Sequence, residues 1–295
     1  MTVKRMKSEE LMAKTVVKAV ALCVAGMLAL GSQPVRAADP VAEAVTIDTT
    51  YTVFTPQVRL RHPPHPAHAS VILLTGGDGR LSLSDGTDPI NPAGTVINST
   101  GNFLIRSANK FLREGLNVMM ADVEPFFPNV AGNTGIGLGQ RMGATHASQL
   151  QNFVNTAAAR WGKPVWVVGT SNGSISAVTA GGFAPALTGI KGLVLTSTRS
   201  VLNNATNQGL FDLYRTRITV PTLVLWNQDD ACPVSPPAGS AALFAAIPAS
   251  GKKSVALDGG HSVATDNCGA FSEHGYAGIE REAVEKIAHF IKQNP

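Results

Sequence analysis

The chain has 295 residues, of which 44% are hydrophobic and 15% charged, and a formal net charge of +4. Six of its 24 basic residues and two of its 20 acidic residues precede position 38, so residues 38–295 hold 18 of each and are formally neutral. A neutral chain has no electrostatic footprint for nucleic acid or for an anionic membrane surface. Its apolar content suffices for one large, well-buried core.

The N-terminus has the pattern of a secretory signal peptide. Five basic residues between Lys4 and Lys18 precede the apolar stretch from Ala19 to Leu30, and Val35-Arg36-Ala37 has small residues at both recognition positions of a cleavage site. The apolar stretch is short for a membrane span. We therefore expect residues 1–37 to be removed, leaving no stable membrane anchor. Residues 38–295 then form a single domain that is exported to the periplasm or secreted.

The residue patterns predict strands that alternate with helices along the chain. Strands are expected at residues 45–54, 57–62, 70–75, 117–122, 164–169, 192–196, 221–226 and 253–257. Helices are expected at residues 102–114, 144–161, 172–182, 237–247 and 279–293, and long loops at 80–101 and 124–142. This alternation indicates a mostly parallel sheet that is covered by helices on both faces.

One turn in the middle of this pattern is typical of a serine nucleophile. Residues 169–173 read G-T-S-N-G, between an expected strand and an expected helix. This is the pattern of a nucleophile elbow, a tight turn that forces its serine into a strained backbone conformation and exposes the hydroxyl. A side chain at Gly169 or Gly173 would collide with the neighbouring strand or helix. Ser171 is therefore the candidate nucleophile.

A serine nucleophile needs a base, and the base needs a carboxylate that orients it. Asp229 and Asp230 directly follow a later strand, and we favour Asp230 because of its spacing from that strand. His261 follows the last strand closely, whereas His274 precedes the last helix, where Gly275 gives the backbone freedom to turn the ring. We favour His274 as the base, with His261 and Asp229 as the alternatives.

Acyl transfer also requires hydrogen-bond donors for the developing oxyanion. The backbone N–H of Asn172, directly after the nucleophile, is the first expected donor. The second is expected from the glycine-rich segment T-G-G-D-G at residues 75–79, at the N–H of Gly77 or of Asp78. This chemistry requires no metal and no organic cofactor.

Two cysteines remain once the expected signal peptide and its Cys23 are removed. Cys232 and Cys268 are expected to form a disulfide, because the protein is exported to an oxidising compartment. The bridge would close a loop of roughly 37 residues and stabilise the fold by about 4 kcal/mol. Since Cys232 lies just after Asp230 and Cys268 just before His274, we hypothesise that the bridge pre-organises the acid and the base.

The chain resembles proteins of the α/β-hydrolase fold, because G-T-S-N-G is followed by D-D-A-C and then by H-G-Y before the last helix. The segment C-G-A-F-S-E-H-G-Y-A-G-I-E is similar to the C-terminal signature of a group of bacterial α/β-hydrolase-like proteins, which favours His274. Two features depart from the pattern of many lipases and esterases. T-G-G-D-G replaces H-G-G-G, and the segment between Thr198 and Pro221 is too short for a large cap domain.

The resemblance covers nearly all of the mature chain and implies a serine hydrolase that acts on a small-molecule carboxylic ester or related acyl compound. Amidases and acyltransferases use the same triad, so both activities remain alternatives. A non-catalytic protein of this fold that binds a ligand or partner is a further alternative, because fold alone does not define function.

Overall fold

The strands form one eight-stranded sheet in the computed structural model, which describes residues 42–46, 57–61, 63, 66–81, 101–122 and 135–295. They are β1 (Ala42–Thr46), β2 (Gln57–Arg61), β3 (Ala69–Leu74), β4 (Leu116–Ala121), β5 (Val165–Thr170), β6 (Ile190–Thr196), β7 (Thr222–Asn227) and β8 (Lys253–Leu257). Their order in the sheet is β1-β2-β4-β3-β5-β6-β7-β8. β2 is antiparallel to both of its neighbours, β1 and β4. The six strands β3 to β8 pair with one another in parallel.

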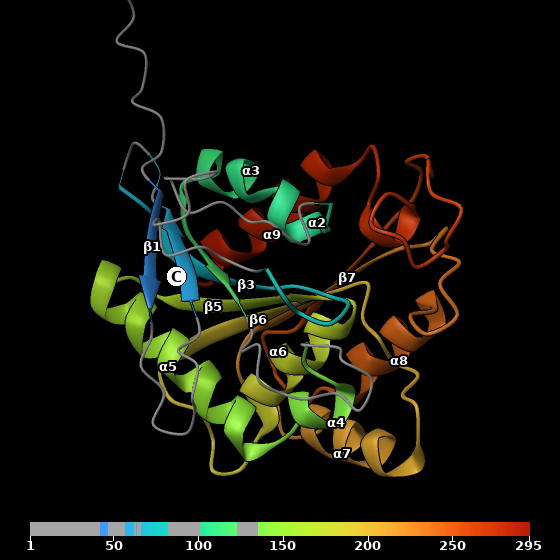
Figure 1. Ribbon diagram of the computed structural model, residues 1–295, viewed down its shortest axis with the longest axis horizontal. Coiled ribbons are helices and arrows are strands. Elements are labelled where there is room, and N and C mark those ends of the chain that lie inside the picture. Colours follow the sequence, from blue (N-terminus) through green and yellow to red (C-terminus); the bar gives the residue numbers. More distant parts are fainter. Residues whose placement is uncertain (1–41, 47–56, 62, 64–65, 82–100, 123–134) are drawn as a thin grey trace, which may run out of the picture. The chain divides into compact units, whose positions relative to one another are not determined.

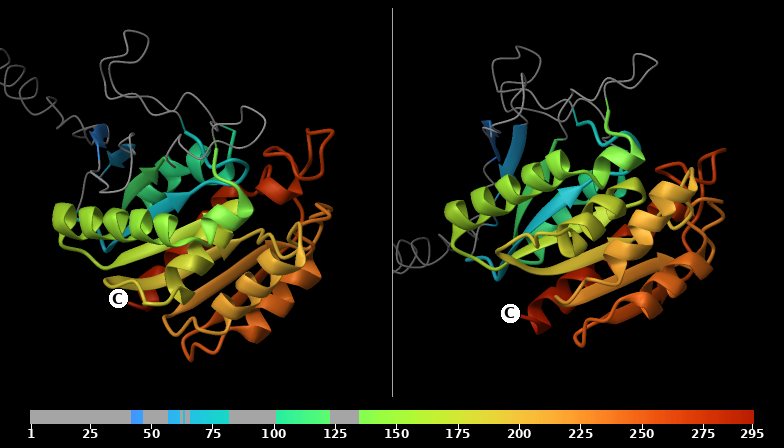
Figure 2. Two further views of the ribbon diagram at one scale, coloured as in Figure 1. Left: turned by 60° about the horizontal axis from the view of Figure 1, so that its bottom comes forward. Right: turned by 90° about the horizontal axis from the view of Figure 1, so that it is seen from below.

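Helices cover both faces of this sheet. They are α2 (Phe103–Arg106), α3 (Ala108–Arg113), α4 (Leu138–Arg141), α5 (Ala144–Trp161), α6 (Asn172–Gly182), α7 (Ala205–Arg215), α8 (Pro237–Ala246) and α9 (Glu280–Gln293). Figure 1 shows α2, α3 and α9 on one face and α4 to α8 on the other. The turned views in Figure 2 bring this second layer to the front, with α5 running alongside the strands. Among the described helices, none is long and apolar enough to cross a membrane.

Alternate residues of the central strands supply two separate cores. Every residue of β3, β4 and β5 is buried. Ile72 and Leu74 of β3 pack in the cluster under α5 and α6, whereas Val71 and Leu73 pack in the cluster under α3 and α9. Successive side chains of a strand point to opposite faces, so a strand between two helical layers must be apolar throughout.

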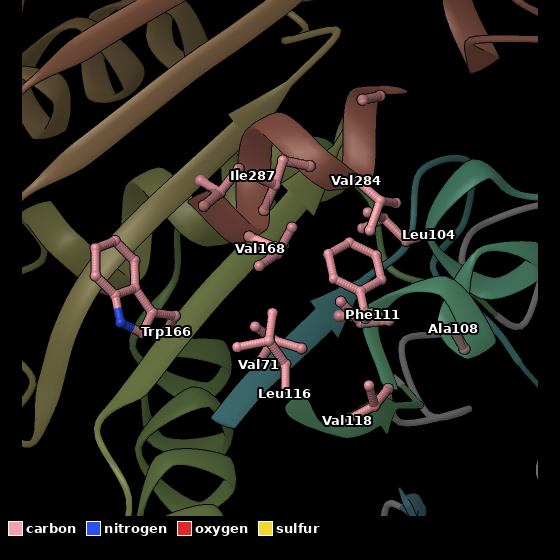
Figure 3. Close-up of a cluster of buried hydrophobic side chains, with 14 of the residues drawn as sticks. Val71, Leu104, Ala108, Phe111, Leu116, Val118, Trp166, Val168, Val284 and Ile287 are labelled. Atoms are coloured by element: carbon pink, nitrogen blue, oxygen red, sulfur yellow. The ribbon is translucent and has the colours of Figure 1, made fainter. Parts of the chain in front are cut away.

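The cluster under α3 and α9 includes the largest fully buried side chain of the described residues, Trp166 of β5. Figure 3 shows Trp166 in this cluster, together with Phe111 of α3 and with Ile287 of α9. The indole also meets the edge of Phe290, with the ring centroids 5.6 Å apart. Gly192 on β6 leaves the space that this ring occupies, because a Cβ there would lie 2.3 Å from Cζ3 of Trp166.

The predicted elements agree with the structure to within two residues, with four exceptions. The helix expected at 102–114 is divided into α2 and α3 at Ser107, where the backbone leaves the helical region with φ −94° and ψ 0°. Serine has a weaker helix preference than most of its neighbours here. Two helices were missed: α7, and the four-residue α4 within the loop expected at 124–142.

The fourth exception is the first strand, because β1 ends at Thr46 and residues 47–54 of the expected strand lie outside the described residues. The expected signal peptide at 1–37 and most of the two long loops also lie outside them. The end of α7 meets Gly182 of α6 so closely that a Cβ on Gly182 would lie 2.1 Å from the Tyr214 carbonyl oxygen. Helix α7 thus packs directly on α6, and no cap domain stands between Thr198 and Pro221.

Replacing Gly192 with Ala tests the packing of the indole. We expect a loss of about 1–3 kcal/mol of unfolding free energy, because the new methyl group must displace Trp166 or the backbone of Pro221. The matched control is Gly209→Ala in α7, where an added Cβ meets nothing within 4 Å. It should be neutral or should stabilise by about 0.5–1 kcal/mol. Urea unfolding measures both, and equal midpoints for the two variants would contradict the assignment.

Candidate active site

The candidate catalytic residues gather at the carboxyl edge of the parallel strands. Ser171 directly follows β5, Asp230 lies three residues after β7, and His274 lies in the segment between β8 and α9. In an open parallel sheet the loops that leave these strand ends meet at one edge, where ligands bind. The parallel topology therefore brings Ser171 and His274 to one edge of the sheet, although they lie 103 positions apart in the chain.

The turn at Ser171 has the strained geometry of a nucleophile elbow. Ser171 has φ 52° and ψ −125°, in the region of positive φ that non-glycine residues rarely adopt. A Cβ on Gly169 would lie 2.3 Å from the Gly173 carbonyl oxygen, and a Cβ on Gly173 would lie 2.1 Å from that of Leu74 in β3. The prediction that side chains at these two glycines would collide with neighbouring elements is confirmed.

His274 and Asp230 form a buried pair. Nδ1 of His274 lies 2.9 Å from Oδ2 of Asp230, and the other carboxylate oxygen accepts the N–H of Cys232, also at 2.9 Å. The side chains are only 5% and 1% exposed. Because the carboxylate accepts the proton of Nδ1, the neutral imidazole presents a lone pair at Nε2. Within the described part of the chain, Nε2 has no hydrogen-bond partner.

The two alternative residues have different surroundings. The carboxylate of Asp229 accepts the N–H of Gly259 at 3.0 Å, which links the turn after β7 to the loop after β8. His261 is exposed, and its ring lies against Gly278, where a Cβ would be 2.7 Å from Nδ1. The geometry therefore brings His274 together with Asp230, and it gives Asp229 a backbone acceptor role.

Buried hydroxyl groups hold the backbone on either side of His274. Ser197, just after β6, donates its hydroxyl to the carbonyl of His274 at 2.7 Å. The Tyr276 hydroxyl donates to the Leu225 carbonyl at 2.9 Å and accepts the N–H of Ser197 at 3.1 Å. Burial raises the pKa of Tyr276, so the phenol keeps its proton. Sequence reasoning missed both residues, although Tyr276 lies in the H-G-Y segment that carries the family resemblance.

Arg106 of α2 also holds the segment that carries His274. Its guanidinium donates to the carbonyls of Gly101, of Ala270 at 2.9 Å and of Gly275 at 2.5 Å. It also pairs with Glu280 at 3.0 Å, at the start of α9. One arginine thus joins the start of α2, the segment that carries His274, and α9. No local pattern indicates this, because the partners Ala270, Gly275 and Glu280 lie more than 160 residues away.

A cleft of about 350 Å³ opens at this edge of the sheet. Ser171 and His274 line it together with Gly76 and Gly77 of the expected oxyanion segment. Cys268 lines it as well. The candidate nucleophile, the candidate base and the glycine-rich segment after β3 therefore share one concave site, which is the usual setting for chemistry on a small molecule.

The glycine-rich segment lies directly against the candidate nucleophile, Ser171. A Cβ on Gly76 would be 2.8 Å from Cβ of Ser171, so only glycine permits this approach. The backbone N–H groups of Gly77 and Asp78 donate to no acceptor among the described residues. Asn172 is the first residue of α6, where the positive end of the helix dipole favours negative charge. These N–H groups are available to an oxyanion at Ser171.

The predicted disulfide between Cys232 and Cys268 is present, with the Cα atoms 4.7 Å apart. It joins the turn that carries Asp230 to the segment that carries His274. Asp230, Cys232 and His274 also bring possible metal-ligand atoms within 4.8 Å of one another. A metal would need the thiolate of Cys232, whose sulfur is already bonded to Cys268. The Cys232–Cys268 disulfide therefore fits a link between the segments of Asp230 and His274 better than a metal centre.

No protein-family model matches the chain, and no curated protein sequence matches it. Several solved structures do resemble it. A dienelactone hydrolase from Anabaena variabilis aligns with a TM-score of 0.57 at 15% identity, over 86% of this chain and 98% of that protein. A thermostable carboxyl esterase from Bacillus coagulans gives 0.56 at 13% identity, over 86% and 99%.

An esterase from Pyrococcus furiosus aligns with a TM-score of 0.56 at 14% identity, over 86% of this chain and 91% of that protein. With this likeness, the strand order and the elbow after β5, the chain has the α/β-hydrolase fold. The fold expected from the sequence is confirmed.

Replacing Cys232 and Cys268 with Ser tests how firmly the bridge holds the two segments. We expect the double variant to lose about 4 kcal/mol of unfolding free energy on the chain-entropy model, because the unfolded chain is no longer cross-linked. Urea unfolding of the variant and of the oxidised protein measures the difference. A variant as stable as the oxidised protein would show that the bridge adds nothing to the fold.

Proposed function

We propose that this protein is an exported serine hydrolase that cleaves a carboxylic ester or a related acyl compound. The observation that carries the proposal is the buried pair of His274 and Asp230, whose imidazole lines the same cleft as the elbow serine, Ser171. A strained serine, a histidine with an unpaired Nε2 and a carboxylate on its Nδ1 are the three parts of a hydrolytic triad.

In the proposed mechanism, Oγ of Ser171 attacks the ester carbonyl while Nε2 of His274 takes the hydroxyl proton. Asp230 keeps the ring oriented and stabilises the imidazolium. The negative charge on the carbonyl oxygen is stabilised by the N–H groups of Asn172 and of Gly77 or Asp78. The alcohol leaves with the proton from His274. Water then attacks the acyl-enzyme with His274 as base, releasing the carboxylic acid and restoring Ser171.

The likeness to esterases and to a dienelactone hydrolase supports hydrolysis of an ester bond as the reaction class. At 13–15% identity this support comes from a shared fold. The assignment to this chain therefore depends on its own site residues. A cleft of about 350 Å³ suits a small acyl substrate.

Export rests on two independent features. Residues 1–37 have the basic, apolar and small-residue order of a signal peptide. The disulfide supports an oxidising compartment, since cytosolic thiols are kept reduced. Removal of the signal peptide would leave a formally neutral protein.

A fluorophosphonate probe tests the nucleophile and the base. We expect the probe to modify Ser171 of the wild-type protein, and we expect His274→Ala to abolish the labelling because Ser171 loses its proton acceptor. The matched control is His261→Ala, which removes a histidine of the same loop and should label normally. Labelling is read by mass spectrometry of the Ser171 peptide.

Two outcomes of the same assay would contradict the proposal. An inert Ser171 in folded wild-type protein would indicate a non-catalytic binding protein of this fold. Loss of labelling in His261→Ala but not in His274→Ala would make His261 the base. A panel of nitrophenyl esters of increasing chain length, run beside a nitroanilide, then reports the acyl length and separates an esterase from an amidase.

The two neighbouring aspartates provide a matched pair for the orienting acid. Asp230→Asn should lower kcat on a nitrophenyl ester by about 10⁴-fold, because the amide stabilises the wrong tautomer of His274. Asp229→Asn should change kcat by less than about tenfold, because among the described residues the Asp229 carboxylate bonds only the backbone N–H of Gly259. Steady-state kinetics at one pH measure kcat of both variants. A larger loss of kcat in Asp229→Asn than in Asp230→Asn would make Asp229 the orienting acid.

A further inference from the structure

A fully buried arginine lies behind the nucleophile, where the mechanism above does not use it. Arg141 is the last residue of α4, and its side chain has no exposed surface. Nη1 donates to the hydroxyl of Ser176 on α6 at 2.8 Å. Nη2 donates to the carbonyl of Gly77 at 3.2 Å. The guanidinium thus bridges the helix that begins at the nucleophile and the segment expected to bind the oxyanion.

The far side of this arginine is fixed by a chain of buried hydrogen bonds. Because Oε1 of Gln149 can only accept, Nδ1 of His146 carries the ring proton, and Nε2 accepts the hydroxyl proton of Ser176 at 2.8 Å. Nδ1 donates to Gln149 at 3.1 Å. Burial, with the charge of Arg141, lowers the pKa of His146 to about 3, so this histidine stays neutral and accepts the hydroxyl proton.

A second donor meets the same carbonyl from the other side. Nδ2 of Asn172 donates to the Gly77 carbonyl at 2.8 Å, and Oδ1 of Asn172 accepts Nη1 of Arg199 at 3.2 Å. Gly77 itself has φ 59°, and a Cβ there would meet nothing within 4 Å. Side-chain packing therefore does not fix the peptide at Gly77. The two donors on its carbonyl hold it, together with the backbone bonds from Gly79 to the Gly76 carbonyl and from Ile136 to the Asp78 carbonyl.

Keeping a guanidinium at this position is energetically costly. Burial, only partly offset by the charge of Asp78, lowers the pKa of Arg141 to about 9. An apolar side chain of similar volume often stabilises a fold as well as or better than a buried charge does. The charge at position 141 is therefore better explained by what it contacts, the Gly77 carbonyl, than by stability.

We propose that Arg141 is a positioning residue for the oxyanion hole. By holding the Gly77 carbonyl from behind, it fixes the backbone of this segment so that the N–H of Gly77 or Asp78 faces the oxyanion at Ser171. Arg141 does not touch the substrate. The role rests on the proposed function, because an oxyanion forms only if Ser171 attacks an acyl carbonyl. Donors that are fixed before the reaction stabilise the transition state more than the bound ester.

Arg141→Met tests this role, because it keeps the length and apolar volume of the stem and removes both hydrogen bonds. We expect kcat on a nitrophenyl ester to fall by about 10- to 100-fold with KM within about twofold, as when a transition-state interaction is weakened. The Ki of an alkyl boronic acid, which forms a tetrahedral adduct with the serine, should rise by the same factor as kcat falls. Arg141→Lys should recover part of both losses.

The matched control is Thr179→Val on α6. Thr179 is buried one turn beyond Ser176, and its hydroxyl has no hydrogen-bond partner in the described part of the chain. Thr179→Val should leave kcat, KM and the boronate Ki unchanged. Ser176→Ala provides a milder second variant, which removes one anchor of the guanidinium and should shift kcat and Ki in the same direction, by less than Arg141→Met.

The outcomes distinguish a failure of the positioning role from a failure of the proposed function. A folded Arg141→Met enzyme with wild-type kcat and boronate Ki would overturn the positioning role. So would a rise in KM as large as the fall in kcat, if Arg141→Lys recovers neither. If Arg141→Met does not fold, an unchanged boronate Ki in Ser176→Ala overturns the role. A wild-type protein that neither binds the boronate nor reacts with the fluorophosphonate would refute the proposed function itself, and the positioning role with it.

Discussion

The close contact between the start of α6 and the end of β3 is the constraint on which the site depends. At Gly173 the helix backbone lies so near the Leu74 carbonyl that even a methyl group would not fit. This contact forces the turn at Ser171 into its positive φ and brings the segment after β3 against the nucleophile. The strain at the serine is tolerated because both neighbouring strands are fully buried and leave the turn no alternative path.

Around this fixed point, Asp230 and His274, the proposed acid and base, are held by several kinds of bond at once. A disulfide joins their segments, and buried hydroxyls of Ser197 and Tyr276 hold the backbone near His274. Arg106 donates to the carbonyls of Ala270 and Gly275 in the same segment. Such redundancy keeps the imidazole in one orientation at little cost during a reaction, which is the physical content of pre-organisation. The arrangement is more rigid than a loop of more than 15 residues between β8 and α9 would suggest.

The fold was largely predictable because its strongest signals are local. Runs of apolar residues between turns predict buried parallel strands, and eleven expected elements agree closely with the structure. The signals failed where elements are short or weakly patterned: α4 has four residues, and the apolar contacts of α7 are made by few side chains, chiefly Phe211 and Tyr214. The division of the helix at Ser107 could not be predicted, since adjacent residues on both sides favour a helix.

The sequence by itself determined which atoms are available: an elbow serine with its two glycines, aspartates after a later strand, two candidate histidines and a pair of cysteines. These follow from residue type and from the order of strands and helices, which are local properties. Only the tertiary structure decided which histidine meets which aspartate, and that Arg141 and Arg106 reach backbone carbonyls at the site. The reason is that hydrogen-bond partners 44 to 169 residues apart depend on strand order and on distances of a few tenths of an ångström, which no local pattern encodes.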